Sequence, residues 1–314
     1  MKKQQTTSNI LMVRPANFGF NTETASNNAF QTQDTAYSTQ EIIEKAKVEF
    51  DNFVNVLKAR AVNIMVADDS VVPKKPDAIF PNNWLTMHED GTMFLFPMFA
   101  ALRRLERNEG IIQMLENQYV VKKKIHLEHY EGVQKYLEGT GSMILDRTHE
   151  IVYACLSLRT DLELLDEYCD LIHYKRIAFR AVDSEGQDIY HTNVMMALGE
   201  TFVVICLDTV INDAERMNLI KHFELTNKEI IEISLEQMMQ FAGNMLQVRN
   251  DFDETFLVMS KQAYSSLNPS QIAHIQRHTE ILYSDIKIIE TFGGGSARCM
   301  MAEIFFEKKE ATEA

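Results

Sequence analysis

Hydrophobic residues follow two patterns along this chain. Short continuous apolar runs predict buried strands, and they fall at 10–13, 62–67, 92–96, 141–146, 151–156, 176–182, 192–197, 202–207, 230–233, 254–259, 285–289 and 298–305. Longer stretches with apolar residues three or four positions apart predict amphipathic helices, at 40–60, 99–117, 160–170, 213–223 and 261–279. In the first helix the apolar positions are Ile43, Ala46, Phe50, Phe53, Val54 and Leu57.

These strands and helices alternate from end to end, often with two or three strands per helix. The runs 141–146 and 151–156 flank the polar sequence RTHE and predict a hairpin. A recurring unit of roughly sixty residues indicates repetition, although the units show no clear sequence similarity. Because no Pro-, Gly- or Ser-rich linker divides the chain, we expect one α/β domain over 1–314, with flexible tails at 1–9 and 307–314.

Composition and charge narrow the range of functions. The 314 residues are 46% hydrophobic, which is enough for a sizeable core, and the formal net charge is −14. An acidic surface repels phosphate groups, so neither nucleic acid nor an anionic membrane is the expected partner. The longest apolar run, 92–102, is too short to span a bilayer and is broken by Pro97. The first residues, MKKQQTTSN, lack the apolar stretch of a secretory signal.

Cysteine usage indicates a reducing compartment. Cys155, Cys169, Cys206 and Cys299 lie far apart, with no CxxC pair and no spacing typical of metal ligands. We therefore expect a cytoplasmic protein, either an enzyme or a binding module, and the sequence predicts no metal or organic cofactor.

The segment ETFGGGSARCM at 290–300 is the first candidate for chemistry. Its glycines and cysteine have an ordinary interpretation, as a flexible turn followed by a small buried side chain. The functional interpretation is that Gly293–Gly295 line a pocket and that Cys299 begins the next strand, facing a substrate. Arg298 would then favour the reactive thiolate form of its neighbour. The segment alone leaves both interpretations open.

Other polar residues at the ends of apolar segments are candidate partners. His191 directly precedes an apolar strand in YHTNVMMALG, where it either caps the strand or acts as an acid and base. Glu138 stands beside a Gly-rich turn in LEGTGS, which lacks the lysine of a phosphate-binding loop. Arg159 follows a strand, a place suited to bidentate capture of a carboxylate. The spacing of Arg103 and Glu106 by itself predicts an exposed helical pair.

In this order the segments resemble the guanidine-modifying superfamily of arginine deiminases, dimethylarginine dimethylaminohydrolases and amidinotransferases. The nearest branch is that of the arginine-deiminase-related, citrulline-utilisation hydrolases. The resemblance extends from MVRPANFGFNTETASNN at 12–28 to GGGSARCMMAEI at 293–304. It implies a five-bladed α/β propeller, or pentein, built from ββαβ units, with a central polar site for a small amino acid. Pairing of such propellers makes a homo-oligomer possible.

The resemblance also implies roles for particular residues. Cys299 matches the family nucleophile, His191 the acid and base, and Glu138 the carboxylate beside it. Arg103 and Arg159 match residues that hold a substrate carboxylate, which replaces the interpretation of Arg103 as part of an exposed pair. Asp77 matches an acidic residue that contacts substrate in the dimethylarginine hydrolases.

At two positions the chain departs from the family pattern. Asn83 and Asn193 stand where related enzymes have aspartates that pair with a cationic guanidinium. An uncharged amide offers two donors and one acceptor, which suits a neutral ureido group better. The expected activity is therefore hydrolysis of a ureido amino acid, citrulline above all, through a covalent S-carbon intermediate. The alternatives are an arginine deiminase or dimethylarginine hydrolase and, in a different class, a non-catalytic propeller that only binds.

Overall fold

The computed structural model describes residues 3–25, 28, 30–32 and 36–310, which form five three-stranded sheets. Each sheet has an antiparallel pair of strands, a helical crossover, and a third strand parallel to the middle one. A parallel pair needs this crossover because a tight turn cannot join its strands. Four of the sheets are β3 (Leu85–Met87), β4 (Thr92–Leu95) and β5 (Lys123–His126); β6 (Ile144–Asp146), β7 (Ile151–Cys155) and β8 (Lys175–Phe179); β9 (Met196–Leu198), β10 (Phe202–Ile205) and β11 (Glu229–Glu232); and β12 (Leu246–Arg249), β13 (Thr255–Ser260) and β14 (Glu280–Ser284).

The fifth sheet joins the two ends of the chain. Its middle strand is β1 (Asn9–Arg14), which pairs in parallel with β2 (Asn63–Asp68) and antiparallel with β15 (Ala302–Glu303). The segments next to β1 and β15 were predicted as flexible tails, but their described residues are bonded to the rest of the chain. Gln5 is buried and donates to the Leu145 carbonyl at 2.8 Å, and residues 307–310 bond back to 118–120. Positions 1–2 and 311–314 lie outside the described residues.

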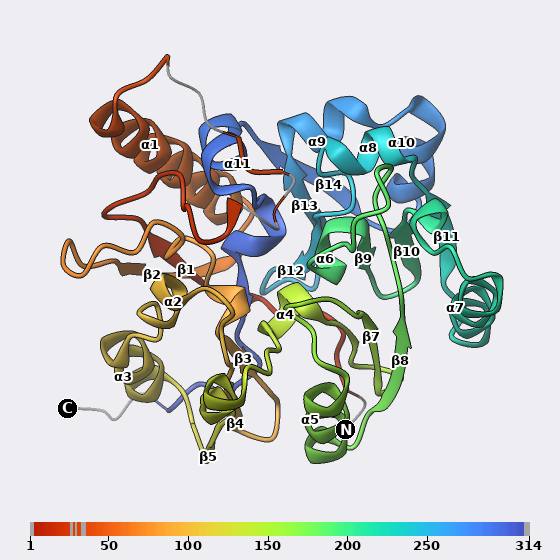
Figure 1. Cartoon of the computed structure of the whole chain (residues 1–314), viewed down its shortest axis with the longest axis horizontal. Helices are drawn as coiled ribbons and strands as arrows, with labels where there is room; N and C mark the ends of the chain where they lie inside the picture. The colour runs from red at the N-terminus through yellow and green to blue at the C-terminus, as the bar shows by residue number, and fades with distance from the viewer. Residues whose placement is uncertain (1–2, 26–27, 29, 33–35, 311–314) are drawn as a thin grey trace.

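The crossover helices lie toward the outside of the molecule, and the short helices α4 (Gly139–Ser142) and α6 (Thr192–Met195) lie near its centre (Figure 1). The crossover helices are α1 (Thr39–Lys58), α3 (Glu109–Gln118), α5 (Leu162–Ile172), α7 (Asp213–Leu225), α9 (Lys261–Ser266) and α10 (Pro269–Gln276). Helix α1 begins at a capping box of Ser38 and Glu41. Its buried face matches the predicted one except that Ile42, rather than Ile43, is buried. The predicted alternation and the repetition are confirmed in the topology.

Several predicted elements were wrong in type or extent. The apolar run 285–289 belongs to helix α11 (Lys287–Gly293), because a short apolar run alone does not distinguish helix from strand. The stretch 261–279 divides into α9 and α10 at Pro269, which starts a new helix but cannot continue one. Likewise, 99–117 divides into α2 (Ala101–Arg104) and α3.

Three predicted strands begin as turns. Residues 141–142 and 192–195 are helical before β6 and β9 start, and 297–300 form the 3₁₀ turn η5 (Ala297–Met300) before the two residues of β15. Strands β3, β5, β12 and β14 and helix α8 (Leu235–Met239) have no counterpart among the predicted elements. These strands are short, and their periodicity is too brief to stand out in the sequence.

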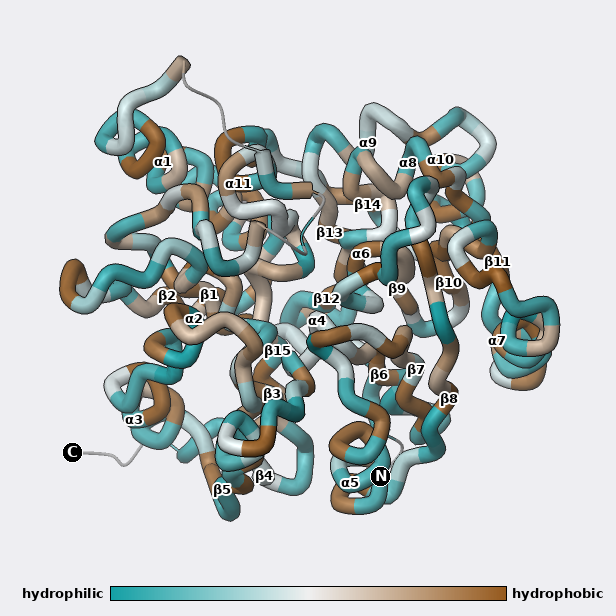
Figure 2. The backbone as a smooth tube through the Cα atoms, viewed as in Figure 1, coloured by the Kyte–Doolittle hydropathy of each residue, from teal (hydrophilic) through white to brown (hydrophobic). Residues whose placement is uncertain are grey.

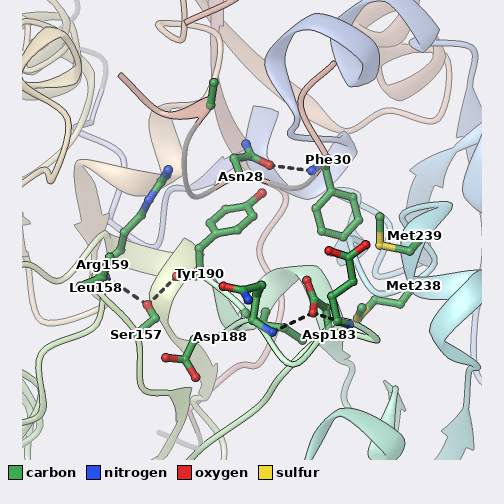
Figure 3. Close-up of a pocket in the computed structure, with 14 residues that line it drawn as sticks. Asn28, Phe30, Ser157, Leu158, Arg159, Asp183, Asp188, Tyr190, Met238 and Met239 are labelled. Atoms are coloured by element: carbon green, nitrogen blue, oxygen red, sulfur yellow. Dashed lines mark hydrogen bonds between the residues drawn. The ribbon is translucent and has the colours of Figure 1, made fainter. Parts of the chain in front are cut away.

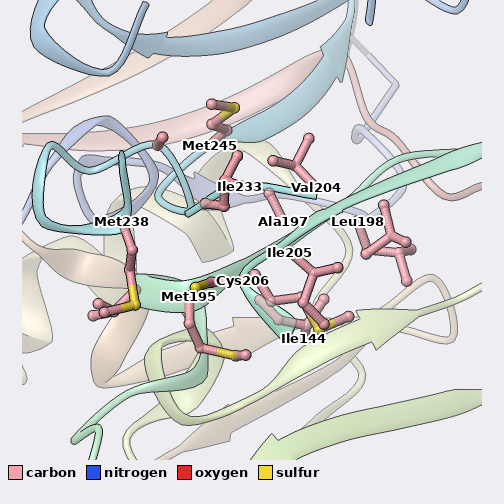
Figure 4. Packing of buried hydrophobic residues seen from close by; sticks show 14 of the residues in the cluster. Ile144, Met195, Ala197, Leu198, Val204, Ile205, Cys206, Ile233, Met238 and Met245 are labelled. Carbon is pink, nitrogen blue, oxygen red and sulfur yellow. The ribbon is translucent and has the colours of Figure 1, made fainter. Parts of the chain in front are cut away.

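The core lies between the sheets and the helices that cover them. Figure 2 shows hydrophobic residues along inner strands such as β10, whereas the outlying helix α7 is largely hydrophilic. In the largest cluster, Met195, Ile205 and Met238 pack together with residues of β6 and β9 (Figure 4). The core thus reaches the short turns, and it holds their backbones in place.

Candidate active site

Five short turns, one before the first strand of each sheet, bring the polar residues together. The turns are η2 (Pro81–Asn83), α4, α6, residues 241–245 and η5. Hydrogen bonds link neighbouring turns: Asn82 Nδ2 to Thr140 Oγ1 at 3.3 Å, Thr192 Oγ1 to the Ser142 carbonyl at 2.5 Å, Asn244 Nδ2 to the Asn193 carbonyl at 2.9 Å, and the Arg298 amide to Asn244 Oδ1 at 3.0 Å. Because η5 also contacts η2, residues distant in sequence converge on one site.

Cys299 lies in turn η5 and is 6% exposed. Two side-chain amides donate to its sulfur: Asn193 Nδ2 at 3.4 Å and Asn244 Nδ2 at 3.3 Å. The prediction that Cys299 begins a strand was wrong, because the chain is still turning there. The guanidinium of Arg298 bonds to Glu303 at 2.8 Å and to the Met301 carbonyl, and its effect on the Cys299 thiolate stays a prediction.

His191 and Glu138 form a buried pair, with His191 Nε2 2.7 Å from Glu138 Oε2. Burial, reinforced by the nearby arginines, lowers the pKa of His191 to about 4 although Glu138 attracts its proton. Burial opposes ionisation of Glu138, but Arg159, His191 and Arg103 together outweigh it and lower the pKa of this carboxyl. At neutral pH the pair is therefore a neutral imidazole beside a carboxylate.

Arg159 supplies positive charge to this pair from a buried position. Its Nη1 lies 3.5 Å from Glu138 Oε2, and its guanidinium lies 4.8 Å from the centre of the Tyr190 ring. The Tyr190 hydroxyl donates to the Gly294 carbonyl at 2.9 Å. Arg159 is thus held flat against an aromatic ring, with its charge directed into the site.

Arg103 is buried, in contrast to the exposed pair that its spacing alone predicts. It makes two bonds of 2.9 Å to Glu106, and Nη1 donates to Asn83 Oδ1 at 2.9 Å. Because arginine only donates, this contact fixes the orientation of the Asn83 amide. Asn83 Nδ2 is then a buried donor without a partner among the described residues.

Asp77 provides an acceptor on the same side of the site. Its Oδ2 accepts from Asn21 at 2.7 Å and lies 3.8 Å from Arg103 Nε, while Oδ1 is buried without a partner in the described part of the chain. Burial raises the pKa of Asp77, although Arg103 and Asn21 oppose this shift.

Glycines permit the close packing of these groups. A Cβ on Gly141 would overlap Asn83 Nδ2 and lie 2.8 Å from ring atoms of His191. Gly294 has a φ of +62°, which favours glycine. The three residues Gly293–Gly295 line the cavity next to Cys299, as the functional interpretation of the glycine run expected, and the substrate in that cavity stays a prediction.

The catalytic cavity holds about 20 Å³, little more than one water molecule. Asp77, Asn83, Arg103, Arg159, His191 and Cys299 line it. Beside it lies an outer pocket of about 320 Å³. Asn28, Arg159 and Tyr190 line both spaces, and Figure 3 shows them at the outer pocket. A cavity of this volume is too small for an amino acid, so binding of one beside Cys299 requires the lining to move.

All eight predicted site residues thus converge, since Glu138 contacts His191 and Asn193 contacts Cys299. Sequence reasoning missed Asn244 and Tyr190. Asn244 had a signal that could have been used: like Asn83 and Asn193, it is an asparagine shortly before the first strand of a sheet.

A model of the eukaryotic N,N-dimethylarginine dimethylhydrolase family matches residues 14–306. The N-terminal domain of ArgZ, with a covalently bound reaction intermediate, superposes with a TM-score of 0.71 at 14% identity, over 94% of this chain and 97% of that one. ArgZ is described as an arginine dihydrolase from the ornithine–ammonia cycle in cyanobacteria.

Two further structures share the fold. An AgrE variant bound to L-arginine has a TM-score of 0.73 at 14% identity, over 94% of this chain and 40% of that one. A dimethylarginine dimethylaminohydrolase adduct with S-methyl-L-thiocitrulline has a TM-score of 0.63 at 14% identity, over 95% and 100%. A search of curated protein sequences found no match. Within the described residues, no helix has the length and hydrophobicity to cross a membrane.

Proposed function

Because the chain belongs to the N,N-dimethylarginine dimethylhydrolase family of the guanidine-modifying superfamily, we propose that it is a cysteine-dependent hydrolase of a ureido amino acid, with citrulline as substrate. The reaction cleaves a carbon–nitrogen bond of the ureido group. The five sheets of identical topology are, in this proposal, the blades of a five-bladed propeller around the site.

The observation that carries the proposal is the orientation of Asn83. Arg103 occupies its oxygen, so Nδ2, a buried donor without a partner among the described residues, is the polar atom that Asn83 has left for a ligand in the cavity that this residue lines. A ureido group carries a carbonyl oxygen that accepts this bond, whereas a guanidinium carries only donors. A buried donor that faces another donor loses its hydrogen bond and the free energy that the bond supplies.

Two other groups complete the recognition of the substrate. Asp77 Oδ1, an acceptor without a partner among the described residues, is placed to receive an N–H of the ureido group. Arg159 is the proposed anchor of the α-carboxylate, because its charge faces the cavity and the outer pocket. Arg103 was expected to share that task, but its bonds to Glu106 and Asn83 support a different role, that of orienting the Asn83 amide.

Catalysis starts with a neutral His191 and a cysteine held by two amides. His191 accepts the Cys299 proton as the sulfur attacks the ureido carbon, and Glu138 stabilises the imidazolium that forms. The imidazolium then protonates the side-chain nitrogen of ornithine, which leaves, and a carbamoyl group remains on the sulfur. His191 next takes a proton from water, which hydrolyses the thioester-like adduct to carbamate and regenerates the thiol. Carbamate decomposes to ammonia and carbon dioxide.

Guanidino substrates are the second candidate. Asp77 and Glu138 place two carboxyl groups at the site, and a desolvated guanidinium would be attracted by both. Arginine would then give citrulline and ammonia, and methylated arginine would give citrulline and a methylamine.

The test is to incubate the purified protein separately with L-citrulline, L-arginine and methylated arginines, and to measure ornithine, citrulline, ammonia and methylamines. Ornithine from citrulline, with arginine untouched, supports the proposal. Citrulline formed from arginine or its methylated forms would replace it with the second candidate. Cys299→Ser, which should fold normally and turn over no substrate, is the control for both. If the unaltered protein turns over none of these substrates, the result would favour a non-catalytic binding protein.

A further inference from the structure

A second large cavity, of about 380 Å³, lies at the opposite ends of two strands that begin at the site. Strand β6 leads from turn α4 to Arg147, and strand β3 leads from Asn83 to His88. Arg147 and His88 line this cavity. Because each strand has three residues, the cavity is separated from the turns by roughly 10 Å.

Arg147 is 4% exposed and has no anionic partner in the described part of the chain. Its guanidinium lies 3.9 Å from the centre of the Phe305 ring, and no described residue accepts a hydrogen bond from it or forms an ion pair with it. Only its backbone amide is bonded, to Gln5 Oε1 at 2.8 Å. One face of the guanidinium is therefore covered by an aromatic ring, while the cavity offers the space beside it.

The nearest carboxylates along the chain are already paired. Asp146 lies 2.9 Å from His149 and 3.3 Å from Lys228. Glu150 lies 2.8 Å from Lys3. A buried cation without a counter-charge is costly, and the charge of Arg147 contributes to the lowered pKa of the neighbouring His88, after burial, which is the larger cause.

We propose that this cavity is a binding site for a small ligand that presents one oxyanion group, a carboxylate or a phosphate, to Arg147. A guanidinium binds either group with two parallel hydrogen bonds. Lys123 lines the same space and adds positive charge, whereas Lys3, which also lines it, is paired with Glu150. Glu89 and Asp90 line it as well, so the remainder of the ligand is neutral or cationic.

The test measures thermal stability and calorimetric affinity with inorganic phosphate, acetate and glycine at constant ionic strength. Arg147→Gln removes the proposed anion contact. Arg159→Gln is the matched control, because Arg159 is the buried arginine that anions in the catalytic cavity would contact. We expect at least one probe to raise the melting temperature of the unaltered protein and of Arg159→Gln, and its affinity for Arg147→Gln to fall about tenfold or more. Comparison of phosphate with acetate shows which oxyanion the site binds. Glycine, which carries an ammonium group beside its carboxylate, tests whether the remainder of the ligand is cationic.

Three results would overturn the proposal: no binding of any probe, equal binding to Arg147→Gln, or loss of binding in Arg159→Gln alone. If Arg147→Gln fails to fold, Lys123→Glu replaces it, because this side chain is exposed and lines the cavity. Unchanged affinity in Lys123→Glu would then exclude the site. None of these outcomes depends on turnover of citrulline, so this proposal and the proposed function can fail separately.

Discussion

Asn83→Asp tests the proposed substrate through a single atom. The new side chain has nearly the same shape, and its Oδ1 can keep the bond of 2.9 Å that Asn83 accepts from Arg103. Only the second terminal atom changes, from a buried amide nitrogen that donates, and that has no partner among the described residues, to an oxygen that accepts. Arg103 lies beside the new carboxyl and favours its ionised form.

The magnitude follows from the two substrates' opposite hydrogen-bonding needs. A ureido oxygen that faces the new carboxylate loses its donor in a buried site, at a cost of about 1–3 kcal/mol. A guanidinium gains a charge-assisted bond of about 1.5–3 kcal/mol in the same place. The ratio of kcat/KM for citrulline to kcat/KM for arginine should therefore fall by roughly 10²–10⁴-fold, which corresponds to about 2.5–6 kcal/mol.

The assay measures kcat/KM for both amino acids by ornithine and citrulline formation. Two variants separate the effect of charge from general damage. Asn83→Ala removes the donor without adding an acceptor, so it should lower kcat/KM for citrulline but give arginine no charge-assisted bond. Asn244→Asp makes the same chemical change at an amide that contacts Cys299 at 3.3 Å, so it should lower both rates and leave their ratio nearly unchanged.

An unchanged ratio in Asn83→Asp, with the protein folded, would refute the reasoning. It would mean that Asn83 does not face the reacting group, and that the choice between ureido and guanidino substrates is made elsewhere. A ratio that moves toward citrulline would refute it more directly, because the donor would then have no favourable role.

Further predictions concern the groups around the nucleophile. Glu138→Gln should lower kcat about 10²–10⁴-fold, and because Glu138 raises the pKa of His191, the acid limb of the kcat/KM profile should move to lower pH. The pKa of His191 is lowered from 6.5 to about 4 in the fold. The stability that comes from a neutral His191 is therefore complete above pH 6.5 and is lost as the pH falls toward 4. In His191→Gln the free energy of unfolding should accordingly depend less steeply on pH in this range, which acid denaturation would measure. Gly141→Ala should abolish activity, because its Cβ would overlap Asn83, while the circular dichroism spectrum stays that of the unaltered protein. Gly132→Ala, with open space around it, should leave activity unchanged. Asn244→Ala should slow turnover and alkylation of Cys299 by iodoacetamide about tenfold or more, and an unchanged alkylation rate would argue against its contact of 3.3 Å with the sulfur.

The sequence alone determined the alternation of strands and helices, because hydrophobic periodicity reports which face of a segment is buried. It also determined the candidate residues, through their resemblance to the guanidine-modifying superfamily. For short elements the hydrophobic periodicity was a weaker guide to the type of secondary structure. The run 285–289 was predicted as a strand and is part of helix α11, since five apolar and polar positions fit either structure.

Only the tertiary structure decided how the polar groups are oriented. Arg103 and Glu106 have the spacing of an exposed helical pair, yet both are buried, because sequence spacing shows which side chains are neighbours but not whether another segment covers them. The direction of the Asn83 amide follows from Arg103, 20 positions away, and Asn244 contacts Cys299 across 55 positions. Such contacts arise from the packing of five turns against one another, and a linear sequence does not contain their geometry.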